Sequence, residues 1–176
     1  MLLKKTLAYV SVLVAATAMV VSAAKLPRPL ADSKIQMPAS DKPLRLIDTR
    51  GKIRVIVLMS SHCAECKAAV KIFSKVERVY RAKGIVFYGA AVDVTNPREL
   101  TPFLVETQSS FPIGVMTQFD TEQAADFKSP ERPFVPIVLF VDKTNHVKFQ
   151  FSGNEDFFKD QENRTRGVLE TMLKQQ

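Results

Sequence analysis

Few residues in this sequence can bind a metal or form disulfides. The 176 residues include two cysteines, Cys63 and Cys66, two histidines, His62 and His146, and no tryptophan. Metal sites built from cysteine and histidine usually need four ligands, and His146 lies in a distant predicted turn. A framework of several disulfides is excluded because only one cysteine pair is present. We therefore expect no metal and no separate cofactor. A metal-carrying site would have to use Cys63, Cys66 and His62.

Signals for nucleic-acid binding and for repeats are also missing. The formal net charge is +7, but the basic residues are scattered among acids and are not interleaved with aromatic residues. No nucleic-acid-binding motif is present, and we find no internal repeat. A composition of 46% hydrophobic and 24% charged residues is that of an ordinary globular protein. The length is that of a single domain. The scattered charge and the missing motif argue against nucleic-acid binding.

The N-terminal segment has no charge between Thr6 and Val21, although Lys4 and Lys5 precede it and small residues follow it. This order is typical of a secretory signal peptide. Residues 6–24 are also nearly long enough to cross a bilayer. Residues 1–24 are therefore either a cleaved signal peptide or a membrane anchor, and both place the remaining chain in the periplasm or an equivalent extracytoplasmic space. A lipid-modified N-terminus is excluded because no cysteine lies near this segment.

The remaining chain divides into a linker and one α/β domain. Residues 25–43 contain four prolines and little apolar content, which predicts an extended linker outside the core. Residues 44–176 show alternating strand and helix patterns. We predict strands at 44–48, 53–59, 85–94, 109–116, 132–142 and 147–153, and helices at 63–83, 96–108, 120–127 and 162–174.

This order predicts an α/β sandwich with a central mixed sheet flanked by helices. The strands at 53–59 and 85–94 are almost entirely apolar, as expected of strands buried on both faces. A strand–helix–strand unit places them parallel with a right-handed crossover. Residues 132–153 then form an antiparallel pair. Asn96 caps the helix before the later strand, with Pro97 and Glu99 completing a capping box.

The two cysteines lie where a predicted strand meets a predicted helix. Cys63 is at the helix N-terminus, where free amide groups and the helix dipole favour a thiolate. Cys66 lies one turn later and can attack a mixed disulfide formed at Cys63. This spacing predicts a redox-active disulfide with Cys63 as the nucleophile and Cys66 as the resolving thiol.

Other uses of the pair remain open to different degrees. A purely structural disulfide would close too small a loop to stabilise the fold much. Haem attachment is excluded because Lys67, not histidine, follows the second cysteine. His62 is either a cation that favours the Cys63 thiolate or an exposed loop residue. Glu65 either tunes the pair and moves protons or is simply a solvated acid at a helix start.

The segments "LRLIDTRGKIRVIVLMSSHCAECK", "VFYGAAVDV" and "FVPIVLFVDKTNHVKFQFSG" together resemble the thioredoxin-like superfamily. They are similar in particular to its exported TlpA/ResA-like thiol–disulfide oxidoreductases. The helix and strand inserted between residues 96 and 118 favour this branch over plain thioredoxin. The resemblance implies a cis peptide bond at Val135–Pro136 that faces the cysteines and pairs with an extended substrate segment.

The sequence also departs from the family pattern around the pair. His62 stands where thioredoxins carry tryptophan, and Val57 stands where they carry a buried acid. Ala69 replaces a glutamate that is common in the TlpA/ResA-like branch, and Lys71 replaces a proline. Glu65 is therefore the only acid close to the cysteines in the sequence, although another acid could approach in space.

The sequence thus predicts an exported enzyme that exchanges thiols and disulfides in other proteins. The resemblance implies protein thiols or disulfides as substrates, an upstream electron donor or acceptor such as a membrane protein, and a role such as cytochrome c maturation. Whether the enzyme reduces, oxidises or isomerises disulfides is left open. The alternatives are a non-catalytic binding module that uses the Pro136 groove, and a metal chaperone that uses Cys63, Cys66 and His62.

Overall fold

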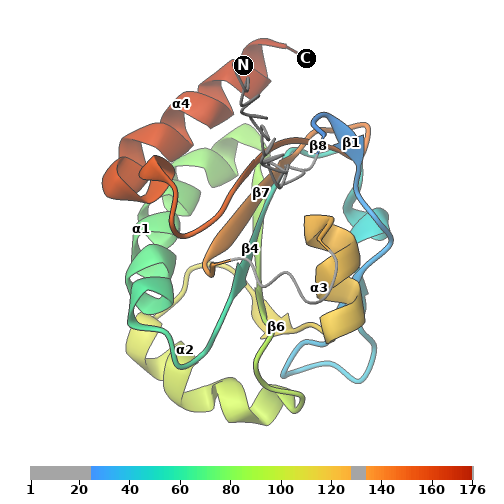
Figure 1. Ribbon diagram of the computed structural model, residues 1–176, viewed down its shortest axis with the longest axis vertical. Coiled ribbons are helices and arrows are strands. Elements are labelled where there is room, and N and C mark those ends of the chain that lie inside the picture. The colour runs from blue at the N-terminus through green and yellow to red at the C-terminus, as the bar shows by residue number, and fades with distance from the viewer. Residues whose placement is uncertain (1–24, 128–133, 176) are drawn as a thin grey trace, which may run out of the picture.

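The computed structural model describes residues 25–127 and 134–175 (Figure 1). The expected signal peptide or anchor of residues 1–24 lies outside the described residues, as does the start of the strand predicted at 132–142. Within the described residues, no helix combines the length and the apolar character needed to span a membrane.

The described residues form short strands, helices and 3₁₀ turns in alternation. The strands are β1 (Arg28–Pro29), β2 (Lys34–Ile35), β3 (Leu44–Arg45), β4 (Arg54–Met59), β5 (Val86–Ala91), β6 (Ile113–Val115), β7 (Ile137–Val141) and β8 (His146–Phe151). The α-helices are α1 (Ala64–Tyr80), α2 (Thr101–Thr107), α3 (Gln118–Ala125) and α4 (Gln161–Lys174). The 3₁₀ helices are η1 (Leu46–Thr49), η2 (Arg81–Lys83), η3 (Pro97–Leu100) and η4 (Asp156–Asp160).

The central sheet is mixed, which confirms the predicted fold class. Its strand order is β1-β8-β7-β4-β5-β6, with β4, β5 and β6 parallel and β7, β8 and β1 antiparallel to their neighbours. Helix α1 connects β4 to β5, so the predicted strand–helix–strand unit is confirmed. The segment inserted between β5 and β7 supplies the edge strand β6, as predicted.

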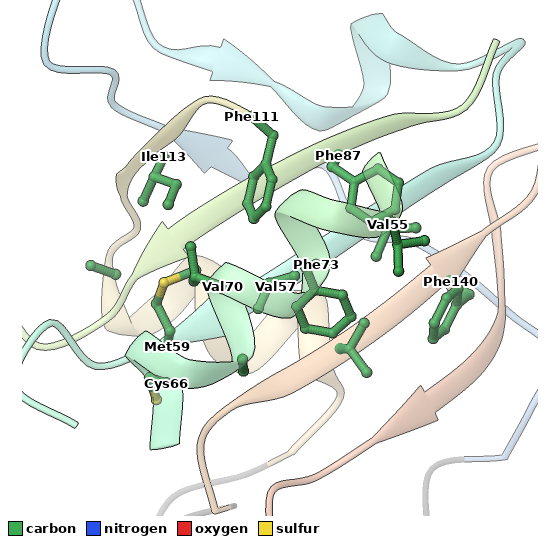
Figure 2. Close-up of a cluster of buried hydrophobic side chains, with 14 of the residues drawn as sticks. Val55, Val57, Met59, Cys66, Val70, Phe73, Phe87, Phe111, Ile113 and Phe140 are labelled. Carbon is green, nitrogen blue, oxygen red and sulfur yellow. The ribbon is translucent and has the colours of Figure 1, made fainter. Parts of the chain in front are cut away.

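Side chains of β4 alternate between two apolar clusters because successive residues of a strand point to opposite faces. Val55, Val57 and Met59 pack into the first cluster with the inner faces of α1 and α4 (Figure 2). Ile56 and Leu58 pack into the second cluster on the other face. In Figure 1, α1 and α4 cover one face of the sheet and α3 covers the other.

Residues 25–43 depart from the expected linker. The segment is extended, but it crosses the second face of the sheet instead of lying outside the core. It begins with β1 paired to β8 and ends with Gln36, which exchanges two backbone hydrogen bonds of 2.9 Å with Val115 of β6. Leu30 and Ile35 are buried in the second cluster. The few apolar residues of this proline-rich segment are therefore part of the core.

The strand–turn–strand expected at residues 44–59 is wrong in its first half. Only Leu44–Arg45 is a strand, and it pairs with β2 and not with β4. Residues 46–49 turn into η1, which buries Leu46 in the second cluster. The buried guanidinium of Arg54 donates to the carbonyl oxygens of Leu46 at 2.9 Å and Asp142 at 3.1 Å. These bonds tie η1 to the β7–β8 turn.

Helix caps decide where the two remaining segments start. The capping box predicted at Asn96 is present, with Pro97 in the first turn of η3. The short helix predicted to start after Asp120 begins earlier, at Gln118. Thr117 is its cap, because its hydroxyl accepts the Asp120 N–H at 3.1 Å. Asp120 thus lies inside the first turn, where an acid favours the helix dipole.

Candidate active site

Cys63 is the N-cap residue of α1, directly after the turn that follows β4. Its backbone is extended, with φ −86° and ψ 123°, and its sulfur accepts the Cys66 N–H at 3.2 Å. Cap residues normally use an oxygen to accept this otherwise unpaired N–H. A sulfur in this place faces the positive end of the helix dipole. The side chain of Cys63 is only partly buried, so a partner can reach it.

Cys66 lies one turn later and is buried at the edge of the first cluster (Figure 2). Burial raises the pKa of the Cys66 thiol above its ordinary value, and the hydrogen bond with Cys63 and the charge of Asp93 act in the same direction. The two cysteines are not joined to each other. The pair is therefore asymmetric, with one accessible sulfur and one buried thiol that stays protonated.

Glu65 is exposed between the two cysteines and contacts the first of them. The Cys63 thiol donates to its Oε2 atom at 3.4 Å. Two hydrogen bonds lower the pKa of Glu65. The larger effect comes from its own backbone N–H and the smaller from the Cys63 thiol. The structure thus places a charged acid beside the Cys63 sulfur, where it can accept the thiol proton.

Asp93 is the acid that sequence reasoning missed. It follows β5, and β5 lies parallel to β4, so both strands end at the same edge of the sheet. Its carboxylate accepts hydrogen bonds from the Ser60 hydroxyl at 2.7 Å, the Ser61 N–H at 2.9 Å and the Ser61 hydroxyl at 3.0 Å. An acid directly after the second of two parallel strands was the signal that could have found it.

His62 is joined to the same carboxylate. Its Nδ1 atom lies 3.0 Å from Oδ2 of Asp93, while 82% of the side chain is exposed. Partial burial acts to raise the pKa of Asp93, but the hydrogen bonds from His62 and the two serines before it outweigh this effect and lower the pKa to about 2. Asp93 is thus ionised at neutral pH and accepts hydrogen bonds from the turn that leads into Cys63.

The Val135–Pro136 peptide bond is cis in the structure. Val135 packs against the first cluster, as Cys63 does. The Gly153 N–H donates to the Phe134 carbonyl oxygen at 2.8 Å. A Cβ atom on Gly153 would lie 2.6 Å from the Val135 oxygen, so the chain just after β8 approaches this turn too closely for a side chain.

Two hollows open beside Asp93 at this edge of the sheet. One has a volume of about 430 Å³ and is lined by Asp93, Val135 and apolar side chains of β4, β7 and the end of α3. The other, of about 470 Å³, lies between Asp93, the start of α3 and the segment around Gln36. Within residues 25–127 and 134–175, no group of three Cys, His, Asp or Glu side chains is placed to hold a metal ion.

No protein-family model matches the sequence, and no curated protein matches it significantly. Solved structures do match. A thiol:disulfide interchange protein of the thioredoxin family from Chlorobium tepidum has a TM-score of 0.62 and 16% identity over 81% of this chain and 97% of its own. The thioredoxin domain of a thiol-disulfide oxidoreductase from Bacteroides vulgatus has a TM-score of 0.63 and 15% identity over 81% and 96%.

A third match is a secreted Mycobacterium tuberculosis disulfide oxidoreductase homologous to E. coli DsbE. It has a TM-score of 0.55 and 15% identity over 77% of this chain and 96% of its own. At these identities the likeness concerns the fold. The chain therefore has the thioredoxin-like fold.

Proposed function

We propose that this protein is a thiol–disulfide oxidoreductase that acts on protein disulfides and thiols outside the cytoplasm. The observation that carries the proposal is the asymmetry of the cysteine pair. Cys63 is accessible at a helix N-terminus and accepts the Cys66 N–H, whereas Cys66 is buried one turn later. A thiolate at a helix N-terminus is a good nucleophile, and a buried neighbour one turn away is placed to resolve the product.

The reaction proceeds in two balanced steps. In the first, the Cys63 thiolate attacks a partner disulfide, its S–S bond breaks, and one partner sulfur leaves as a thiolate that takes up a proton. In the second, Cys66 loses its proton and attacks the Cys63 sulfur, which releases the other partner sulfur. The partner gains two electrons and two protons, and Cys63 and Cys66 become a disulfide. The reverse sequence oxidises a dithiol, and an upstream donor or acceptor sets the direction.

Two further parts of the proposal rest on the sequence and on the fold. The charge-free segment before residue 25 supports export, by a signal peptide or with an anchor at residues 6–24. A membrane protein is then a suitable electron donor or acceptor. Val135 and Pro136 would contact the bound partner segment, because Val135 lines the hollow beside Asp93. Substrates in cytochrome c maturation fit this location.

Trapping of a mixed disulfide tests the proposal. With Cys66→Ser, Cys63 should form a stable mixed disulfide with a small test disulfide, oxidised glutathione. Mass spectrometry should show one added glutathione. Cys63→Ser is the matched control, since a serine hydroxyl also caps a helix and the fold is kept. It should form no adduct. Failure of Cys66→Ser to form an adduct would overturn the proposal, and stoichiometric copper or zinc in the purified protein would favour the metal chaperone.

A further inference from the structure

The turn before Cys63 is held by one carboxylate. Asp93 accepts hydrogen bonds from three successive residues, through the Ser60 hydroxyl, the Ser61 N–H and hydroxyl, and Nδ1 of His62, at distances between 2.7 and 3.0 Å. None of these residues lies near Asp93 in the sequence. The turn also has local hydrogen bonds, from the His62 N–H to the Ser60 hydroxyl at 3.2 Å and from the Cys63 N–H to the Ser60 carbonyl oxygen at 3.4 Å. Asp93 adds contacts that tie this turn to the segment after β5.

The same carboxylate determines which nitrogen of His62 carries a proton. An ionised carboxylate can only accept hydrogen bonds, so the Nδ1 atom that lies 3.0 Å away carries hydrogen. The Ser61 hydroxyl also lies 3.0 Å from Nδ1, and in this arrangement its single proton is donated to Asp93. In a neutral ring that carries its hydrogen on Nδ1, Nε2 is the nitrogen that can accept a proton. No hydrogen bond to Nε2 occurs among the described residues, and 82% of the side chain is exposed. Nε2 is thus open to solvent and to a bound partner.

The other titratable groups around the turn are few. Glu65 comes from the first turn of α1 and is hydrogen-bonded to the Cys63 thiol. Cys66 lies below in the first cluster. Asp93, from the segment after β5, is hydrogen-bonded to the turn itself. Glu65 is therefore the acid hydrogen-bonded to Cys63, and Asp93 is the acid hydrogen-bonded to His62.

We propose that Asp93 is the positioning residue of this site, which fixes the turn that presents Cys63 and holds His62 as the Nδ1–H tautomer with Nε2 free to exchange a proton with the reacting thiols. The consequence for the reaction rests on the proposed function. The Cys63 thiol gives its proton to Glu65, to which it is hydrogen-bonded. His62 takes up a proton from solvent at Nε2 and gives it to the partner thiolate that leaves, so His62 ends the step neutral and the proton balance closes.

The tautomer can be observed directly by NMR of the ring nitrogens in the reduced protein. The chain has only two histidines, so the signals of His62 and His146 can be assigned with one variant, His146→Gln. Neutral His62 should be the Nδ1–H form in the wild-type protein. In Asp93→Asn the amide group can donate to Nδ1, and the ring should change to the Nε2–H form. An Nε2–H ring in the wild-type protein would overturn the proposal without any variant.

Asp142→Asn is a matched control for this substitution. Asp142 also caps a turn, accepting the N–H groups of Thr144 at 2.9 Å and His146 at 2.8 Å, with His146 Nδ1 at 4.0 Å. Asp142 follows the last residue of β7, which pairs with the start of β4, whereas the cysteines follow the end of β4. The control should leave the His62 tautomer unchanged. A change of the same size in both variants would contradict a specific role for Asp93.

Two substrates distinguish a loss of proton transfer from a change in the conformation of the turn before Cys63. Oxidised glutathione releases a basic thiolate that needs a proton, whereas dithiobis(nitrobenzoate) releases a weakly basic thiolate that does not. His62→Gln and Asp93→Asn should each slow the reduction of oxidised glutathione by about 10-fold to 100-fold, with little effect on dithiobis(nitrobenzoate). Both substitutions remove the same proton transfer, so the double variant should be slowed by less than the product of the two single effects. Equal slowing on both substrates would overturn the proton-exchange role.

These two measurements also distinguish this inference from the proposed function. If the cysteine pair does not react with disulfides at all, the proposed function fails, but the tautomer measurement still reports on Asp93. If the pair reacts normally and the tautomer does not depend on Asp93, the inference fails and the proposed function stands.

Discussion

At the scale of single residues, Asp93 shows how a partly buried acid can stay charged. Partial burial opposes ionisation, but several donors point at the carboxylate, and the pKa falls to about 2. Those donors belong to the turn that leads into Cys63. The same contacts therefore hold the candidate site in place and contribute to the stability of the fold.

This linkage predicts how acid affects stability. In an unfolded chain the pKa of an aspartate is about 3.9, so the folded protein holds Asp93 ionised more strongly than the unfolded chain does. The contribution is present in full above about pH 4 and is lost as the pH falls to about 2. The wild-type advantage over Asp93→Asn in free energy of unfolding should shrink by about 2 kcal/mol over this range. Urea titrations at several pH values measure it, and a difference independent of pH would contradict it.

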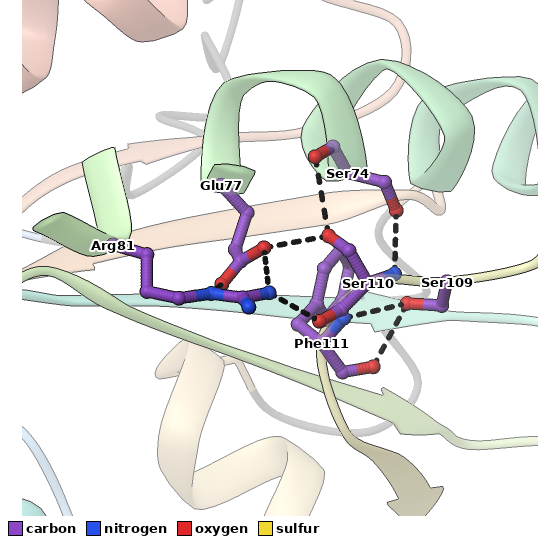
Figure 3. A network of polar contacts seen from close by, with 6 residues as sticks. All are labelled: Ser74, Glu77, Arg81, Ser109, Ser110 and Phe111. Atoms are coloured by element: carbon purple, nitrogen blue, oxygen red, sulfur yellow. Dashed lines mark hydrogen bonds and ion pairs between the residues drawn. The ribbon is translucent and has the colours of Figure 1, made fainter. Parts of the chain in front are cut away.

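At the scale of elements, a buried polar network ties α1 to the segment before β6 (Figure 3). The Glu77 carboxylate accepts two hydrogen bonds of 2.7 Å from Arg81 and one of 2.7 Å from the Ser110 hydroxyl. Burial acts to raise the pKa of Glu77, but these bonds lower it overall. Ser110 is also bonded to Ser74, one turn earlier on α1. The inserted segment is therefore attached to the helix that starts at the cysteines.

Glu77→Gln should destabilise the protein by about 1–3 kcal/mol. The buried carboxylate is replaced by a neutral amide with one acceptor oxygen, while the Arg81 and Ser110 donors remain. Glu162→Gln is the matched control. Glu162 forms an ion pair of the same spacing with Arg166, but the Glu162 side chain is 39% exposed to solvent, whereas that of Glu77 is 7% exposed. The control should change stability by less than about 0.5 kcal/mol. Equal effects in urea titrations would contradict a structural role for the network.

At the scale of the whole molecule, residues 25–43 complete the second face of the sheet. The segment passes from the β8 edge to the β6 edge and buries Leu30 and Ile35 over β4 and β7. Arg28 anchors it by donating to the Ala124 carbonyl oxygen and to Gln150, each at 2.7 Å. The absence of a side chain on Gly114 matters here, because a Cβ atom would lie 2.8 Å from Ile35.

A chain that begins at residue 44 should therefore be much less stable than one that begins at residue 25. Loss of two buried aliphatic side chains removes about 3–6 kcal/mol, a large part of the stability of a typical domain. Ile35→Ala tests the same contact in the intact chain and should cost about 2–5 kcal/mol, whereas Val105→Ala, at a side chain 71% exposed, should cost little. Thermal unfolding measures both. Equal stability of the two chains would show that the segment is a linker after all.

Much of the fold could be predicted from local patterns. The apolar runs of β4 and β5, the helix that starts at Cys63 and the capping box at Asn96 each depend on residues that are neighbours in the sequence. The asymmetric placement of Cys63 and Cys66 also followed from their position between a strand and a helix. The linker at residues 25–43 and the full length of the strand at residues 44–48 were mispredicted, because proline content and short apolar runs do not show which face of a sheet a segment covers.

Periodicity, caps and spacing act over a few residues, so the order of the elements and the position of the cysteine pair could be predicted from the sequence. Which acid joins the site depends on the tertiary structure. Asp93 meets the Ser60–His62 turn because β4 and β5 pair in parallel and end at one edge. Strand register brings together residues that are distant in the chain. The pairing of His62 with Asp93, and the packing of residues 25–43 over the sheet, were settled by that register and not by any local pattern.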